Sequence, residues 1–314
     1  MVKLSRKRDG VKMSKLMVRI GKLKLPNPTV LTSGVLCNGS LLKRAAIEGG
    51  AGAVVTKSLT KEKREGYPTP VIVGVKEGLV NAVGLANQGY EEFLSLDLPL
   101  AKEGKVCVIV SVAGGRVEEF EEICTRAEEA GADAVELNLS CPHVRKHGIE
   151  MGGDPEIVRR LVRGVKGALE IPVHVKLGLS DRLNDSAIAA QNAGADAIVV
   201  INTIKAMTID VHARKPVLSN VYGGLSGPAI HPIALRCVYE LYPQLSIPIV
   251  GCGGVKDWQT AVDFMLAGAK AVQIGSAVAT KGIGMFKEVT KGIECYLDSH
   301  GFKSVEEIIG SAHG

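Results

Sequence analysis

One short pattern occurs four times along this chain: Gly-Ala-x-Ala followed by β-branched residues, at 50–54, 131–135, 194–198 and 268–272. Each copy follows a stretch with helical periodicity and leads into a short apolar run. A glycine just past a helix is a common helix terminator, and a strand buried on both faces of a parallel sheet is continuously apolar. The repeat therefore predicts an α/β chain in which helices alternate with parallel strands.

Further apolar segments fill the intervals between these copies. Together they predict eight strands, at residues 28–34, 51–57, 106–112, 134–139, 172–177, 197–202, 248–251 and 271–275. Eight strands that alternate with helices over about 250 residues are typical of a (β/α)8 barrel, the TIM barrel. An open doubly wound sheet is the alternative. Such a sheet carries a glycine-rich phosphate turn after its first strand, and residues 33–39 lack that pattern.

Two intervals are long enough for additions to the barrel. The interval 58–105, after the second strand, exceeds the length of one helix and predicts an inserted hairpin with a ligand-facing loop. The polar loop after the fourth strand contains Gly148, Gly152 and Gly153 and predicts an active-site lid. Because no Ser-, Gly- or Pro-rich linker interrupts the chain, residues 16–314 are expected to form a single barrel domain after a basic extension at 1–15.

Positive charge is concentrated at the amino terminus. Residues 1–25 hold nine Lys or Arg and one Asp, so the formal charge of +5 becomes −3 on the remaining residues (+5 minus +8). A mildly acidic body lacks the basic face that nucleic-acid binding requires. No apolar run reaches the roughly 18 residues that cross a bilayer. We therefore expect a soluble protein with neither a nucleic-acid nor a membrane partner.

The seven cysteines are odd in number, scattered, and contain no C-x-x-C pair. This distribution is not typical of a disulfide framework, a zinc site or an iron–sulfur cluster on this chain. A reducing, cytoplasmic environment is expected, with no metal. Cys107, Cys124, Cys237 and Cys295 lie in apolar or helical patterns and are predicted to be inert core thiols.

Polar residues and glycines follow the predicted strands at the ends where a barrel places its active site. They are Lys57-Ser58, Asn138 to His143, Lys176, Asn202-Thr203, Gly251 to Gly254 and Gly275-Ser276. Glycines after the last two strands let backbone N–H groups approach a phosphate closely. A phosphorylated ligand is therefore expected at this mouth.

Two side chains allow more than one chemistry. Lys176 closes an apolar strand, where its ammonium would stabilise an anionic cofactor or its free amine would form a Schiff base in an aldolase or lyase. Cys141 enters the polar loop after the fourth strand, where it would act as a nucleophile or a general base. A barrel that only binds a ligand or partner is the third interpretation.

In this order and spacing the motifs resemble those of the class 1 dihydroorotate dehydrogenases, most closely the catalytic subunits of class 1B. The resemblance runs from about residue 16 to about residue 300. It is carried by Thr56-Lys57-Ser58, Asn81 to Asn87, Asn138 to Pro142, Ile201-Asn202-Thr203, Gly223 to Ala229, Gly251 to Gly254 and Gly275-Ser276.

The resemblance implies an FMN-binding barrel that oxidises dihydroorotate to orotate in the biosynthesis of pyrimidines (UMP). It implies that Cys141 is the base for the C5 proton while C6 delivers hydride to flavin N5, and that Lys57 is also catalytic. The implied substrate-binding residues are Lys57, Asn81, Ala82, Val83, Gly84, Leu85, Asn138, Asn202 and Thr203. The implied FMN-binding residues are Ser33, Lys57, Ser58, Ser111, Asn138, Lys176, Ile201, Gly227, Gly253, Gly254, Gly275 and Ser276. Lys176 would lie against the pyrimidine end of the flavin and stabilise its anionic reduced form.

The chain departs from the class pattern at three places. Ser111 stands where the class usually has Asn, Gly178-Leu179 replaces Ser-Pro after Lys176, and His143 replaces Asn. The resulting Ser-Cys-Pro-His resembles the pyrimidine-reducing domain of dihydropyrimidine dehydrogenases. Reduction of uracil or thymine is therefore an alternative activity.

The resemblance also bears on partners. In class 1B a second subunit with FAD and an iron–sulfur cluster passes electrons to NAD, which implies a heterotetramer, whereas class 1A homodimers use fumarate. The chain itself is expected to form a homodimer. The membrane-associated class 2 enzymes use a serine base, so Cys141 argues against quinone as the acceptor here.

Overall fold

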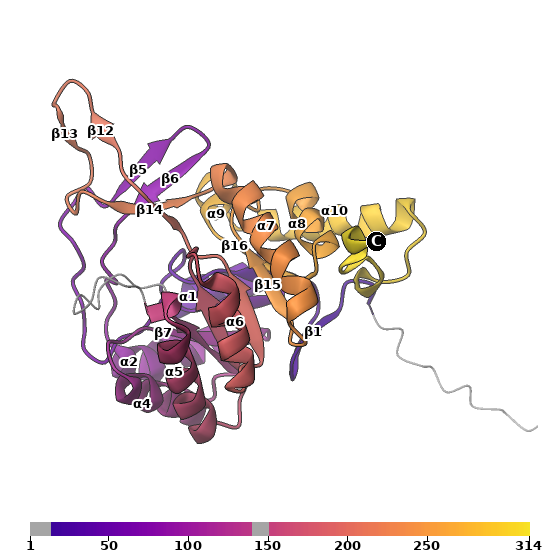
Figure 1. The fold of residues 1–314 in the computed structure, drawn as a ribbon, viewed down its shortest axis with the longest axis horizontal. Helices are drawn as coiled ribbons and strands as arrows, with labels where there is room; N and C mark the ends of the chain where they lie inside the picture. Colours follow the sequence, from indigo (N-terminus) through magenta and orange to yellow (C-terminus); the bar gives the residue numbers. More distant parts are fainter. Residues whose placement is uncertain (1–13, 140–150) are drawn as a thin grey trace, which may run out of the picture.

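The computed structural model describes residues 14–139 and 151–314. Its centre is a closed barrel of eight parallel strands (Figure 1). In chain order these are β3 (Thr29–Leu31), β4 (Ala53–Val55), β7 (Cys107–Val112), β8 (Ala134–Asn138), β9 (Val173–Leu177), β10 (Ala197–Val200), β15 (Ile249–Cys252) and β16 (Ala269–Ile274). Each falls in or overlaps a predicted segment, and β16 pairs with β3 to close the ring. The (β/α)8 prediction is confirmed, and the open-sheet alternative is wrong.

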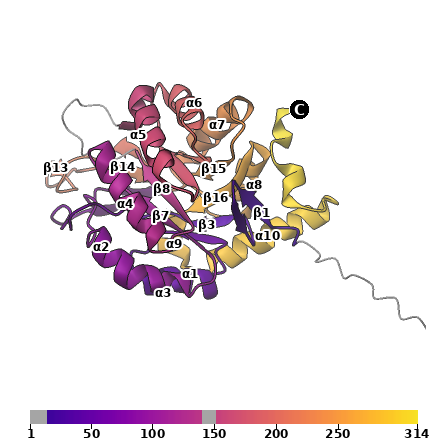
Figure 2. The same cartoon turned by 90° about the horizontal axis from the view of Figure 1, so that it is seen from below.

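Helices surround the barrel on its outside (Figures 1 and 2). They are α1 (Gly39–Ile47), α2 (Tyr90–Glu92), α3 (Leu98–Lys102), α4 (Val117–Glu129), α5 (Pro155–Ala168), α6 (Leu183–Asn192), α7 (His231–Leu241), α8 (Trp258–Leu266), α9 (Ser276–Lys281) and α10 (Met285–Ser299). Shorter helical turns are η1 (Phe93–Asp97), η2 (Met151–Gly153), η3 (Pro228–Ile230), η4 (Tyr242–Gln244), η5 (Val305–Ile308) and η6 (Ser311–His313). The glycine of each Gly-Ala-x-Ala copy follows α1, α4, α6 or α8 with φ between 80° and 118°, as a helix-terminating glycine does.

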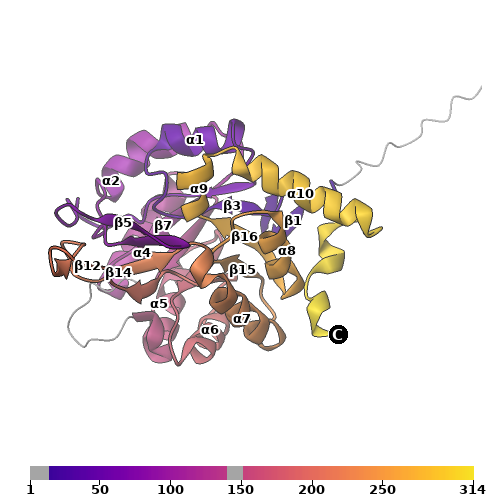
Figure 3. The same cartoon turned by 90° about the horizontal axis from the view of Figure 1, so that it is seen from above.

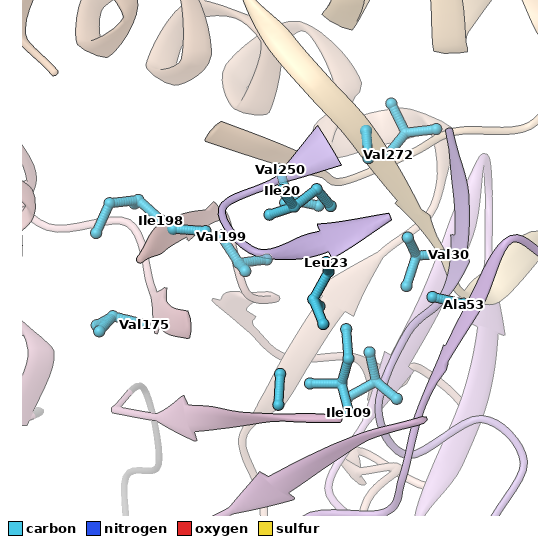
Figure 4. Packing of buried hydrophobic residues seen from close by; sticks show 14 of the residues in the cluster. Ile20, Leu23, Val30, Ala53, Ile109, Val175, Ile198, Val199, Val250 and Val272 are labelled. Carbon is cyan, nitrogen blue, oxygen red and sulfur yellow. The ribbon is translucent and has the colours of Figure 1, made fainter. Parts of the chain in front are cut away.

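A hairpin that the sequence analysis did not predict lies at the amino ends of the barrel strands. It pairs β1 (Val18–Ile20) with β2 (Leu23–Leu25), and its residues alternate between buried and exposed. Figure 4 shows Ile20 and Leu23 among side chains of the barrel strands, including Val30 and Ile109. The hairpin therefore closes the amino end of the barrel with apolar side chains.

A second sheet lies at the opposite, carboxyl end, and Figure 3 shows its strands projecting to one side of the barrel. Its order is β11 (Ile204–Ala206), β14 (Gly223–Ser226), β6 (Gly78–Asn81) and β5 (Ile72–Val75), all antiparallel. The β5–β6 hairpin lies in the interval 58–105, while β11, β14 and the small β12 (Ile209–Asp210) and β13 (Lys215–Pro216) pair were not expected. This sheet joins the segments after β4 and β10, which are far apart in the sequence.

The first prediction concerns the β1–β2 hairpin. Leu25 is fully buried, so Leu25→Ala should lower the free energy of unfolding by about 2–5 kcal/mol, through lost burial and the cavity left behind. Lys24→Ala, at the neighbouring exposed position, should change it by less than about 0.5 kcal/mol. Equilibrium denaturation in guanidinium measures both, and equal effects would contradict the packing role of the hairpin.

The second prediction concerns His174 on β9, which is fully buried and whose Nε2 has no hydrogen-bond partner among the described residues. Burial lowers the pKa of His174 to about 4, although Asp196 opposes the shift. Because the unfolded chain takes up this proton near pH 6.5, stability should fall as pH drops from about 6.5 to 4, by at most about 1.4 kcal/mol per pH unit. His174→Phe should remove this part of the slope in denaturation curves measured across that window. An unchanged slope would show that His174 is not the group responsible.

Candidate active site

Hydroxyl groups from three neighbouring strands meet at the carboxyl mouth of the barrel. Ser58 Oγ, just after β4, lies 3.1 Å from Ser33 Oγ, after β3, and 2.9 Å from Ser111 Oγ on β7. Ser58 and Ser111 are buried, and the Ser111 N–H donates to Thr56 Oγ1. Ser111, the residue that departs from the class pattern, is thus held in the site through Ser58.

Two amides extend this hydrogen-bonded chain across the mouth. Asn138, at the end of β8, donates from Nδ2 to Ser58 Oγ over 3.1 Å, and Asn202 donates from Nδ2 to Asn138 Oδ1 over 3.2 Å. The Thr203 N–H in turn donates to Asn202 Oδ1 over 2.8 Å. The structure therefore brings together six of the residues predicted from the strand ends and the resemblance: Ser33, Ser58, Ser111, Asn138, Asn202 and Thr203.

The second sheet brings Asn81 to the same side of the mouth. Asn81 Nδ2 donates to the Gly224 carbonyl over 3.3 Å, and a Cβ on Gly224 would lie 2.0 Å from Thr203 Oγ1. Asn81 and Thr203 thus pack against the same glycine. Lys57 is half-buried at the end of β4, and its Nζ would lie 3.6 Å from a Cβ on Gly34.

The loop after Asn81 is bound mainly to the preceding insertion. The Ala82 N–H donates to the Val71 carbonyl, and the Val83 carbonyl accepts from the Tyr67 N–H. Gly84 and Leu85 line a cavity of about 570 Å³ together with the segment 60–67 and residues 114, 115 and 119. These contacts hold residues 82–85 against the insertion, and their part in the predicted substrate site stays a prediction.

Lys176 lies in a buried polar cluster within the barrel, and only 4% of its surface is exposed. Its Nζ donates to Thr32 Oγ1 over 2.9 Å and to Gln273 Oε1 over 2.7 Å. Gln273 also donates from Nε2 to Glu136 Oε2, and Glu136 Oε1 lies 3.9 Å from the ammonium. We call Thr32, Glu136, Lys176 and Gln273 the lysine cluster.

Thr32, Glu136 and Gln273 were not predicted as site residues because they lie within the predicted strands and not after them. Glu136 and Gln273 each interrupt an otherwise apolar strand, β8 and β16. A charged or amide side chain inside such a strand is the signal that would have located them.

Glycines predicted to hold a phosphate approach one another closely. Gly254 has φ 73°, and a Cβ there would lie 2.7 Å from the Gly227 carbonyl and 3.0 Å from the His231 nitrogen at the start of α7. A Cβ on Gly275 would lie 2.7 Å from Thr32 Cγ2, which connects this segment to the lysine cluster. Gly253, Ser276 and Ile201 lie on the same rim, and the Ile201 N–H donates to the Cys252 carbonyl.

The described thiols differ in their surroundings. Cys124 and Cys237 are buried, and burial raises the pKa of each. The prediction of a core thiol is wrong for Cys295, which is exposed on α10. Cys107 is half-buried at the start of β7 and packs against the core, where desolvation raises its pKa. Cys141, His143 and most of the predicted lid lie in 140–150, outside the described residues, whereas Gly152 and Gly153 of that loop form part of η2.

No group of three or more His, Cys, Asp or Glu in 14–139 and 151–314 could hold a metal ion. No described helix is both long and apolar enough to cross a membrane.

The comparisons with known proteins now decide the family. The family model described as dihydroorotate dehydrogenase matches residues 15–297, most of the chain. The chain belongs to the dihydroorotate dehydrogenase family.

Similar proteins within this family carry more specific names. The Pyrococcus furiosus protein named dihydroorotate dehydrogenase B (NAD(+)), catalytic subunit, is 50% identical over 294 residues, covering 91% of this chain and 95% of the relative. The Thermococcus kodakarensis protein of the same name is 48% identical, covering 96% of this chain and 99% of the relative. An Aeropyrum pernix relative, 47% identical over 95% of this chain and 97% of its own length, is named instead for the A (fumarate) type. The B-type names agree with the class 1B resemblance found in the sequence.

Dihydroorotate dehydrogenases depend on FMN, and the site fits this group in two respects. Because Gly254 has no side chain, its backbone packs closely against the Gly227 carbonyl and the start of α7, which brings together segments predicted to hold the cofactor. The ammonium of Lys176 donates two of its three protons within the lysine cluster, and no described residue accepts the third, which leaves one donor for the cofactor.

Proposed function

We propose that this chain is a catalytic subunit that oxidises dihydroorotate to orotate in pyrimidine biosynthesis, with FMN bound at the barrel mouth. The observation that carries the proposal is the hydrogen-bonded chain from Ser58 through Asn138 to Asn202, in a barrel of the dihydroorotate dehydrogenase family. Such amides offer donors and acceptors in one plane, as the edge of a flat pyrimidine requires. Residues 16–314 would act as one FMN-binding domain.

Bound FMN would supply a two-electron acceptor for hydride. Its phosphate would take backbone N–H groups at Gly253, Gly254, Gly275 and Ser276, with Gly227 close by. With its third N–H, the Lys176 ammonium would donate a hydrogen bond to the pyrimidine end of the flavin. The other contacts would come from residues around the mouth, namely Ser33, Lys57, Ser58, Ser111, Asn138 and Ile201.

The substrate would be held by its polar edges. Asn138, Asn202 and Thr203 would hold it together with Asn81, which packs beside Thr203 against Gly224, while residues 82–85 and Lys57 would supply the remaining contacts. Cys141 would take the proton from C5 while hydride leaves C6, which breaks both C–H bonds and forms the C5–C6 double bond of orotate. A thiolate suits this step because its ordinary pKa, about 8.5, is close to neutral pH.

The surroundings of Lys176 favour this function over a Schiff-base aldolase. A Schiff base needs a free amine that the substrate can reach. Lys176 is instead buried, and its nitrogen is held by hydrogen bonds to two oxygen acceptors, 3.9 Å from the carboxylate of Glu136, so it is not free to attack a substrate carbonyl.

The names of the relatives also bear on partners. Because several are called catalytic subunits of an NAD(+)-linked enzyme, we propose that this chain pairs with an electron-transfer subunit. That subunit would carry FAD and an iron–sulfur cluster and pass electrons to NAD, in a cytoplasmic heterotetramer built on a homodimer. Fumarate, the acceptor in the name of the Aeropyrum relative, is the alternative electron acceptor. An assay that compares NAD with fumarate as acceptor would distinguish the two.

The third prediction tests the reaction. Anaerobic addition of dihydroorotate should bleach the visible absorbance of the bound FMN, and Cys141→Ala should slow bleaching at least about 100-fold, the usual loss of a general base. Cys295→Ala, which removes an exposed thiol on α10, serves as the matched control and should bleach at the parent rate. Stopped-flow absorbance measures all three proteins.

Three results would contradict this proposal. A protein that neither retains nor takes up flavin would exclude the reaction, and equal bleaching by Cys141→Ala would exclude Cys141 as the base. Faster bleaching by dihydrouracil than by dihydroorotate would assign the uracil-type activity instead.

The fourth prediction tests the glycine rim. Gly254→Ala combines a left-handed φ of 73° with a Cβ 2.7 Å from the Gly227 carbonyl, so FMN should bind at least about tenfold more weakly. Gly282→Ala is the matched control because its φ is 69° but no atom lies within 4 Å of the added Cβ. Fluorescence titration of the apoproteins with FMN measures the affinity of each variant. Equal losses of affinity in both variants would show that backbone strain, and not the contact with Gly227, causes the effect.

A further inference from the structure

Glu136 is a carboxylate in the middle of a barrel strand, and the proposed reaction gives it no role. It is fully buried, between Val135 and Leu137 of β8. Its Oε2 accepts a hydrogen bond from Gln273 Nε2 over 2.5 Å, whereas its Oε1 has no hydrogen-bond partner among the described residues. A buried carboxylate with one unsatisfied oxygen is costly, so a compensating interaction is expected.

Lys176 provides the compensating charge but not the missing hydrogen bond. Its Nζ is 3.9 Å from Glu136 Oε1, close enough for strong Coulombic attraction inside a protein. Yet the two described hydrogen bonds of the ammonium go to Thr32 and Gln273. The two charges therefore balance each other while the third proton of Lys176 stays uncommitted.

Gln273 holds the two charged groups in this arrangement. Its Oε1 accepts from Lys176 and from Thr32, and its Nε2 donates to Glu136. Because one planar amide bonds both partners, neither side chain can turn to the other without breaking a hydrogen bond. The separation of 3.9 Å is thus fixed by a residue on β16, across the barrel from β8 and β9.

The strand register places Glu136 below the mouth. Asn138 of β8 is the pairing partner of Lys176 on β9, and Glu136 lies two residues earlier, opposite His174. Asn138 and Lys176 are therefore nearer than Glu136 to the carboxyl end where a ligand binds. Glu136 would therefore act on a ligand at the mouth from a level below Lys176, by offsetting the charge of that ammonium.

We propose that Glu136 is a positioning residue that offsets the charge of Lys176 and so sets the reduction potential of the flavin at the barrel mouth. The proposal rests on the proposed function, because it assumes FMN beside Lys176. An unbalanced ammonium stabilises the reduced flavin, which carries the added negative charge. The Glu136 carboxylate opposes this effect and holds the potential lower than Lys176 alone would set it.

The fifth prediction tests this proposal with Glu136→Gln, which keeps the shape of the side chain and an oxygen acceptor for Gln273. Removal of the negative charge should strengthen binding of reduced relative to oxidised FMN about tenfold. For a two-electron couple this corresponds to a rise of about 30 mV in midpoint potential. Reductive titration of the holoprotein against a reference dye measures the potential without any turnover.

A charge swap provides the sharpest control. The double variant Glu136→Gln with Gln273→Glu returns one carboxylate to the lysine cluster, now on β16 and in direct contact with Lys176. Its potential should fall back to the parent value or below it. Ser186→Ala removes a buried hydroxyl that has no described partner on α6, outside the lysine cluster, and should leave the potential unchanged.

The outcomes separate the two proposals. If the parent protein binds no FMN, the proposed function fails and this inference fails with it. If FMN bound to Glu136→Gln has the midpoint potential of the parent, only the role of Glu136 is overturned. The same holds if the midpoint potential of the double variant is as high as that of the single variant. Should Glu136→Gln not fold, Glu136→Asp withdraws the carboxylate by one methylene and should raise the potential by a smaller amount, and no rise would likewise overturn the inference.

Discussion

The closure of the parallel barrel is the constraint on which the rest of this structure depends. Because all eight strands run in one direction and close into a ring, their carboxyl ends meet at a single mouth. Ser58, Asn138 and Asn202 come from three different strand ends, yet they form one hydrogen-bonded chain. The same closure leaves an amino end that must be covered, and the β1–β2 hairpin covers it with Ile20 and Leu23.

The barrel interior also holds charge, and this requires compensation. An ammonium that is only 4% exposed would be costly without acceptors, and Lys176 has two, together with a carboxylate at 3.9 Å. Each member of the lysine cluster comes from a different strand or strand end. Stability and chemistry are therefore linked here. The contacts that offset the cost of burying Lys176 also set the electrostatic potential that its ammonium produces at the mouth.

The second sheet shows how distant segments complete one site. Asn81 follows the second barrel strand and Thr203 follows the sixth, yet both pack against Gly224 because β6 and β14 pair. The sequence analysis placed Asn81 and Thr203 in the same site only through the family resemblance. Pairing between strands about 145 residues apart has no local signal, since each strand is only four residues long.

The sequence by itself determined the barrel, the strand ends and most of the residues gathered there. It could do so because helix-terminating glycines and continuously apolar strands are local signals, and because the fold places every strand end at one mouth. Only the tertiary structure decided which polar groups bond to one another, how the amino end is closed, and that Glu136 and Gln273 surround Lys176. These depend on distances between strands that are remote in the chain, and no local pattern of residues encodes such distances.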